Sequence, residues 1–128
     1  MTKLLFFIFL CFASLVTDAQ SYRYRAVFEE VKVNGKKEQS ESKKLIIVNI
    51  DDYFVKIYGA TTERFDIYET FEINDSTFMF PALDKDGNDF AIELLISGKY
   101  TYITIQTPTE NELGEFDRRR FVCIKIEE

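Results

Sequence analysis

The sequence contains no histidine and no tryptophan, and it has only two cysteines and two prolines in 128 residues. Histidine is the usual general base of serine and cysteine hydrolases and the commonest neutral metal ligand, so its absence argues against both kinds of site. The chain also has no glycine-rich phosphate loop and no Cys/His grouping. We therefore expect a protein that is not an enzyme and that carries no cofactor and no metal.

Basic side chains are also few. Sixteen Lys and Arg stand against 22 Asp and Glu, which gives a formal charge of −6. A protein with this charge has little general affinity for the nucleic-acid backbone or for anionic lipid surfaces. Nucleic acid is therefore not an expected partner.

Aromatic side chains are abundant, with 13 Phe and 7 Tyr. Such residues suit the pleated, half-buried surface of a sheet. A chain of this length, 46% hydrophobic, can build one packed core but not two. The composition predicts a single β domain.

The first residues have the layout of a secretory signal. Lys3 precedes an apolar run, Leu4–Val16, and the small residues Thr17 and Ala19 fit a cleavage site that would leave Gln20 at the mature N-terminus. A membrane anchor is the alternative, but the run is shorter than the ~20 residues that span a bilayer. We expect a signal peptide over 1–19, a mature domain over 20–128 without a transmembrane segment, and export to the periplasm or outside the cell.

The two cysteines have different expected fates. Lipid modification of Cys11 is the less favoured alternative, because the preceding Leu10 is not small. After cleavage at Ala19 only Cys123 remains, so no internal disulfide can form. Cys123 is expected to be a half-buried apolar residue, with an exposed thiol that pairs between chains as the alternative.

About eight segments of the mature chain show strand character, and none shows a sustained helical period. Asp84–Asn88, with its Asp-Gly pair, marks the clearest hairpin. A slip in the alternation at Glu29-Glu30 suggests a bulge, Pro81 suggests an edge position or a bulge, and 36–44 reads as a polar loop. The expected strands cover 22–33, 45–50, 53–58, 65–73, 78–83, 90–96, 100–107 and 119–126.

Short connections between successive strands favour an antiparallel up-and-down meander. A sheet of about eight strands has to curl into a barrel or fold into two layers. We expect an all-β fold in the form of a partly closed, lipocalin-like barrel. A two-layer sandwich is the alternative.

Several residues are candidates for a ligand site. Glu69 falls on the apolar face of its expected strand, where an ionised carboxylate needs a partner or water. It therefore lies at a strand end or bulge, or lines a polar pocket. Tyr100 and Tyr102, like Tyr22 and Tyr24, share one sheet face and form either core pairs or a binding surface. The candidate ligand-binding residues are Glu69, Phe65, Phe71, Tyr100 and Tyr102.

Two charged clusters are further candidates for a binding role. Asp84, Asp86, Asn88 and Asp89 could surround calcium, but Gly87 directly follows Asp86, unlike the spacing of an EF-hand, and a plain hairpin turn is favoured. The cluster Arg118–Arg120 could grip a phosphate or carboxylate. Pairing with acidic neighbours across the sheet is the favoured interpretation.

The middle of the mature chain resembles small exported bacterial proteins of unknown function. The resemblance rests on Lys56-Ile57-Tyr58, Phe65-Asp66-Ile67-Tyr68, Phe78-Met79-Phe80, Ala82-Leu83-Asp84-Lys85-Asp86-Gly87 and Ile92-Glu93-Leu94. It implies an exported all-β domain and carries over no active-site residue. Those proteins often have a cysteine near the Asp-Gly turn, and this chain has none there.

The leading hypothesis for function is a non-enzymatic binding or interaction module of the cell envelope, with an unknown protein partner. The alternative is a lipocalin-like carrier of a small apolar molecule, in a cavity lined by Phe65, Phe71, Phe90 and Leu94. A hydrolase that uses only carboxylates, with Glu69 as the first candidate, is a third possibility.

Overall fold

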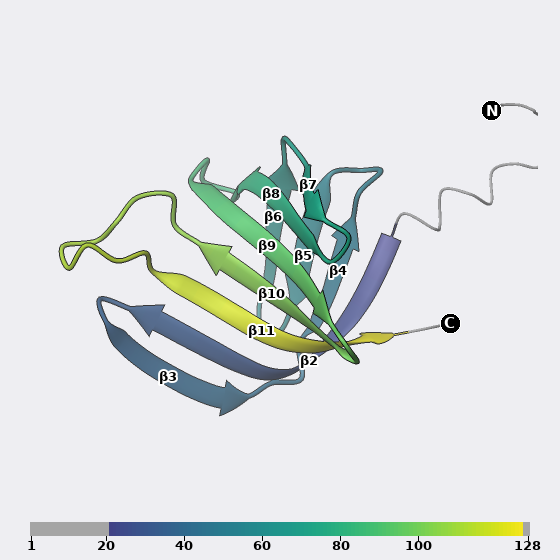
Figure 1. Ribbon diagram of the computed structural model, residues 1–128, viewed down its shortest axis with the longest axis horizontal. Coiled ribbons are helices and arrows are strands. Elements are labelled where there is room, and N and C mark those ends of the chain that lie inside the picture. Colours follow the sequence, from purple (N-terminus) through teal and green to yellow (C-terminus); the bar gives the residue numbers. More distant parts are fainter. Residues whose placement is uncertain (1–20, 127–128) are drawn as a thin grey trace, which may run out of the picture.

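A computed structural model describes residues 21–126, and this range contains ten strands and no helix (Figure 1). It therefore holds no helix long and apolar enough to cross a membrane. The expected signal peptide and Cys11 lie outside the described residues. The strands are β2 (Ser21–Val33), β3 (Lys36–Glu41), β4 (Leu45–Asn49), β5 (Phe54–Tyr58), β6 (Thr62–Ile67), β7 (Phe71–Asn74), β8 (Thr77–Leu83), β9 (Asp89–Ser97), β10 (Tyr100–Gln106) and β11 (Arg118–Ile126).

Eight of these strands form a closed antiparallel barrel. The order β2-β4-β5-β6-β8-β9-β10-β11 is closed by pairing of β11 with β2, where Arg118 lies opposite Lys32 and Ile126 opposite Arg23. β3 and β7 are additional strands, paired with β2 and β8 respectively. The all-β meander and the barrel are therefore confirmed, and the two-layer sandwich is wrong.

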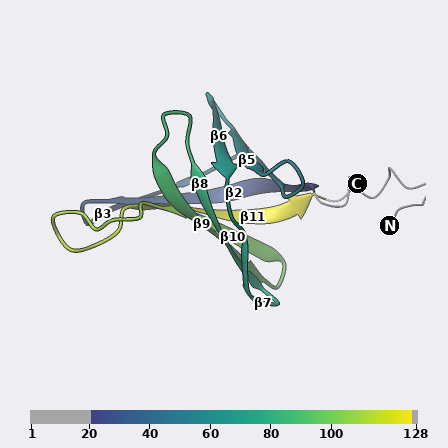
Figure 2. The ribbon, with the colours of Figure 1, turned by 90° about the horizontal axis from the view of Figure 1, so that it is seen from above.

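The segment expected to be a polar loop is in part a strand. Lys36–Glu41 forms β3, which pairs with the second half of β2 as a hairpin. Asn34 and Gly35 make its turn with φ of 52° and 79°, the left-handed conformations that an Asn-Gly turn adopts readily. All six residues of β3 are exposed, as is usual for a charged edge strand, and this is why no apolar alternation marked it. β2, β3 and β11 extend together beyond the rest of the barrel (Figures 1 and 2).

The expected bulge in the first strand exists, but it lies two residues earlier than Glu29. The register between β2 and β11 shifts between Val122 and Cys123, so that Val27 is the extra residue. Beyond the bulge the inward face changes, and Glu29 lies opposite the fully buried Phe121. An acidic residue therefore faces the interior where the unbroken alternation would have turned it outward.

The single strand expected over 65–73 is wrong. The chain forms β6 and β7 with a break at 68–70, and both pair with the same edge of β8. Pro81 lies opposite this break, and its carbonyl accepts a hydrogen bond from the Tyr68 backbone N–H. The proline thus occupies an interior strand, at a point where its missing N–H costs no ladder bond.

Alternate residues of the eight barrel strands fill the middle of the barrel. Cys123 is among them and is fully buried, as expected for an apolar residue rather than an exposed thiol. Eight-stranded barrels are only just wide enough for their side chains. The residues that are less than 2% exposed include Phe121, Ile46, Ile57, Ile92, Ile103, Val48, Val55 and Cys123.

Candidate ligand-binding site

Two pockets formed by the described residues lie at opposite ends of the barrel, on either side of its filled middle. The first, here called the charged pocket, has a volume of about 630 Å³ and is lined by Val31, Val33, Glu63, Phe90, Arg118 and Arg119 among others. The second, the aromatic pocket, has a volume of about 790 Å³ and is lined by Tyr22, Tyr24, Phe71, Phe78, Phe80 and Leu94 among others. Both volumes suit a small molecule.

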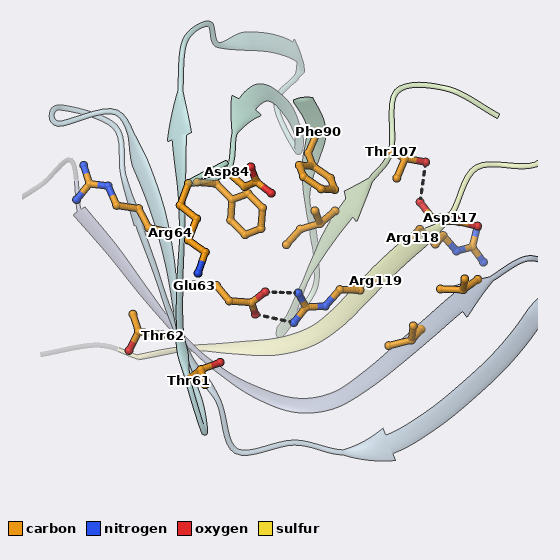
Figure 3. Close-up of a pocket in the computed structure, with 15 residues that line it drawn as sticks. Thr61, Thr62, Glu63, Arg64, Asp84, Phe90, Thr107, Asp117, Arg118 and Arg119 are labelled. Atoms are coloured by element: carbon orange, nitrogen blue, oxygen red, sulfur yellow. Dashed lines mark hydrogen bonds and ion pairs between the residues drawn. The ribbon is translucent and has the colours of Figure 1, made fainter. Parts of the chain in front are cut away.

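An ion pair crosses the charged pocket. Arg119 of β11 donates two hydrogen bonds to the Glu63 carboxylate of β6, at 2.9 and 3.0 Å (Figure 3). These two strands are not neighbours in the barrel, so the pair spans its interior. Bidentate guanidinium–carboxylate pairs are strong and geometrically specific. The pair therefore links two non-adjacent strands across this end of the barrel, and we call it the crossbar.

The crossbar continues into a cluster of four charges. Glu29 lies 3.6 Å from the Arg119 guanidinium and 2.9 Å from the Lys44 ammonium. Arg119 and Lys44 also lie over the ring of Phe121, at 5.1 and 5.6 Å from its centroid. Two cations and two carboxylates thus neutralise one another on top of the core.

The neighbouring arginines are also paired within the chain. Arg118 lies 3.4 Å from Glu30, and Arg120 donates a hydrogen bond to the Thr104 hydroxyl. A hydrogen bond from Gln39, with the positive charge of Lys37 and Arg118, lowers the pKa of Glu30. The interpretation of Arg118 and Arg119 as partners of acidic residues across the sheet is supported, although their partners lie on β2 and β6.

The acidic turn between β8 and β9 satisfies its own carboxylate. Asp84 accepts hydrogen bonds from the backbone N–H groups of Asp86 and Asn88 and from the Asn88 side chain. The bonds from Asn88 and Asp86 lower the pKa of Asp84. The geometry is that of the expected hairpin turn, and within residues 21–126 no three acidic or Cys side chains gather in a way that could hold a metal.

The aromatic pocket has a different character. Its wall is built from inward-facing residues near the ends of the strands, such as Phe78, which lies directly opposite Leu94. On one side the wall is β7, whose four residues are all exposed and which takes over from β6 along the edge of β8. Phe71 of β7 is 43% exposed at the margin of the pocket. The pocket is therefore an open cavity lined by several aromatic rings, with the exposed strand β7 as one thin wall.

Two side chains with hydroxyl groups line the aromatic pocket. Tyr24 is 3% and Thr101 is 5% exposed, and no hydrogen bond joins either hydroxyl to another residue in the part of the chain that the structure describes. Burial, with smaller effects of Tyr22 and Cys123, raises the pKa of Tyr24 to about 12. Neither hydroxyl is a buried atom without a partner, unlike Arg118 Nε at the other end of the barrel, so both are open to the pocket.

The aromatic residues expected to share one cavity are divided between the two ends. Phe65 lies in the charged pocket, where its ring makes an edge-to-face contact with Phe90 at 5.6 Å. Phe71 and Leu94 line the aromatic pocket. The filled middle of the barrel separates the two pairs, so a single cavity lined by all four residues is wrong.

The other candidate residues lie outside the two pockets. Glu69 is exposed in the break between β6 and β7, the strand end expected as one of its two alternatives. Tyr100 and Tyr102 are half-buried and alternate with the buried Thr101 and Ile103. They therefore lie on the outer face of the barrel.

Sequence reasoning missed several residues of the aromatic pocket. The sequence pattern indicates Tyr24 only as one of a core or surface pair, and no motif marks Lys99 or Lys125. The alternation of β11 carries the signal for Lys125, because it lies two residues beyond the inward Cys123. Its proximity to Tyr24 depends on the pairing of β11 with β2, which no short motif announces.

Comparisons of this chain with protein-family models, with curated proteins and with solved structures find no match.

Proposed function

We propose that this protein is a non-enzymatic binding protein that holds a small, largely apolar molecule in the aromatic pocket. The observation that carries the proposal is the pocket itself, about 790 Å³ with rings and aliphatic side chains on its walls. Apolar pockets of this size with a few polar groups are the usual form of small-molecule sites. This function corresponds to the carrier alternative, with its cavity confined to one end of the barrel.

The charged pocket is the poorer site for such a ligand. Its Arg119–Glu63 pair spans the interior, and Glu29 and Lys44 complete a neutral cluster. An apolar ligand there would have to displace satisfied charges and leave them without partners. The aromatic pocket makes no such demand.

The thin wall at β7 offers a route of entry. β6 pairs with β8 only at Asp66–Leu83 and Ile67–Ala82, and nearer the aromatic pocket β8 pairs with the exposed β7. A short exposed strand opens more easily than a buried one. We propose that the ligand enters beside Phe71. The proposal fits an exported protein, as the N-terminal sequence predicts.

The test uses N-phenyl-1-naphthylamine, an uncharged dye whose fluorescence rises in apolar surroundings. Ile96→Trp fills the mouth of the aromatic pocket from a position that is 43% exposed. Val33→Trp adds a similar ring in the charged pocket from a position that is 45% exposed, and serves as the matched control.

We expect the purified protein to bind the dye, Ile96→Trp to weaken binding about tenfold or more, and Val33→Trp to leave it unchanged. The reverse pattern would place the site at the other end of the barrel and refute the proposal. So would a folded protein that does not bind the dye.

A further inference from the structure

The rim of the aromatic pocket carries two cations that have no carboxylate partner among the described residues. Lys125 lies opposite the inward Tyr24 in the β2–β11 pairing, and its ammonium is 5.0 Å from the centroid of the Tyr22 ring. Lys99, in the turn between β9 and β10, lies 5.2 Å from the Tyr100 ring. Within residues 21–126 neither lysine forms an ion pair, whereas Lys44 and Arg119 at the opposite end both do.

The charge at this rim is opposite in sign to that of the whole chain. The residues that line the pocket include two lysines, Lys99 and Lys125, and one acidic residue, Glu72. The protein as a whole carries a formal charge of −6. Positive charge gathered at the mouth of a low-dielectric pocket attracts and retains anions.

Deeper in the pocket, the hydroxyls of Tyr24 and Thr101 have no partner among the described residues. Each can donate a hydrogen bond to an oxygen of a ligand. The pocket thus combines apolar walls, two hydroxyls that are open to it and a cationic rim. An uncharged hydrocarbon would use only the first of these features.

We infer that the ligand is an amphipathic anion, with an apolar chain or ring system against the aromatic walls and one carboxylate or phosphate group beside Lys99 and Lys125. This inference rests on the proposed function and specifies the class of ligand. The cation–π contact with Tyr22, which lines the pocket, keeps the Lys125 ammonium near the mouth without neutralising it. An acidic head group would supply the carboxylate or phosphate partner that the described chain does not provide.

The experiment measures how well three probes displace N-phenyl-1-naphthylamine at pH 8 and low ionic strength. Dodecanoic acid and dodecyl phosphate carry the two candidate head groups, and 1-dodecanol has the same chain without a charge. The test variant is Lys99→Gln/Lys125→Gln. The matched control is Lys36→Gln/Lys43→Gln, which removes two exposed charges remote from the pocket.

We expect at least one of the anions to bind about tenfold more tightly than 1-dodecanol, and Lys99→Gln/Lys125→Gln to remove most of that difference. The control variant should leave it intact, and 0.5 M salt should reduce it. The stronger of the two anions identifies the head group. Tyr24→Phe should weaken binding of that anion by a few fold if its hydroxyl contacts the ligand.

Equal affinity for the anions and 1-dodecanol, together with no effect of Lys99→Gln/Lys125→Gln, would overturn this inference and leave the proposed function standing. Failure of the dye and of every probe to bind would overturn both. Loss of the anion preference in the control variant as well would show that general charge, rather than the rim lysines, is responsible, and would also refute the inference.

Discussion

Replacing Glu29 by Gln tests whether the charged end of the barrel is a structural crossbar. The Glu29 side chain is 12% exposed and lies 2.9 Å from the Lys44 ammonium and 3.6 Å from the Arg119 guanidinium. Glutamine keeps the size and the hydrogen-bonding capacity but removes the charge. Arg119 would then keep Glu63, and Lys44 would lose its carboxylate partner near the Phe121 ring.

The expected loss of stability lies between two known limits. Exposed ion pairs contribute up to about 1 kcal/mol, and breaking a fully buried pair costs about 3–5 kcal/mol. Lys44 and Arg119 are 31% and 25% exposed, so solvent screens part of the interaction. We expect Glu29→Gln to lower the free energy of unfolding by about 1–3 kcal/mol, or the melting temperature by about 4–8 °C for each kcal/mol.

Urea unfolding followed by circular dichroism measures this loss, with the denaturant dependence expected to stay unchanged. Glu38→Gln, on the exposed strand β3, is the control and should change stability by less than about 0.5 kcal/mol. Adding Lys44→Met to Glu29→Gln should cost less than the sum of the two single changes, because the partners are in contact. If Glu29→Gln is no more destabilising than Glu38→Gln, the four-charge cluster does not stabilise this end.

Three further predictions concern the core and a turn. Cys123 is fully buried and burial raises the pKa of its thiol to about 12, so a thiol reagent such as dithionitrobenzoate should react only when the protein is unfolded. The pKa of Tyr24 is about 12 in the folded chain and 10 for the free side chain. The protonated Tyr24 hydroxyl therefore makes its full contribution to folding stability below pH 10, and this contribution falls as the pH rises toward 12. Tyr24→Phe should therefore reduce the loss of stability between pH 8 and pH 11 by about 1.4 kcal/mol in urea unfolding, and an unchanged loss would contradict this. Gly35→Ala should destabilise the protein by about 1 kcal/mol or more, because φ is 79° and a Cβ would lie 3.0 Å from Leu113 Cδ1; an unchanged melting temperature would refute this.

Alternation of apolar residues was enough to predict most of the barrel. Phe90, Ile92 and Leu94, for example, alternate as expected, and the Asp-Gly pair in the turn before them predicted the hairpin. Alternation failed where no face of a strand is buried. β3 is exposed along its whole length, and only the Asn34-Gly35 pair signalled it. β7 is exposed as well, and because Phe71 and Ile73 continue the alternation of β6, the two strands were expected to be one.

The candidate site was harder to predict, because it depends on pairing between distant segments. Phe71, a candidate ligand-binding residue because it is aromatic and falls on the apolar face of its expected strand, lines the aromatic pocket. Lys125 and Tyr24 lie side by side only because the last strand closes the barrel against the first. Similarly, the bulge at Val27 decides that Glu29 faces inward, and a shift of one residue reverses every side chain beyond it.

The two ends of the barrel differ because their polar groups are satisfied in different ways. Glu63 and Arg119 form an ion pair across one end, and with Glu29 and Lys44 they make a neutral cluster within the chain. At the other end the Tyr24 side chain lines the aromatic pocket, and its hydroxyl has no hydrogen-bond partner among the described residues. That hydroxyl is open to the pocket, where water or a ligand can bond it. An apolar ligand can therefore fill the aromatic pocket without breaking an ion pair between described residues, whereas at the charged end it would have to displace the Glu63–Arg119 pair.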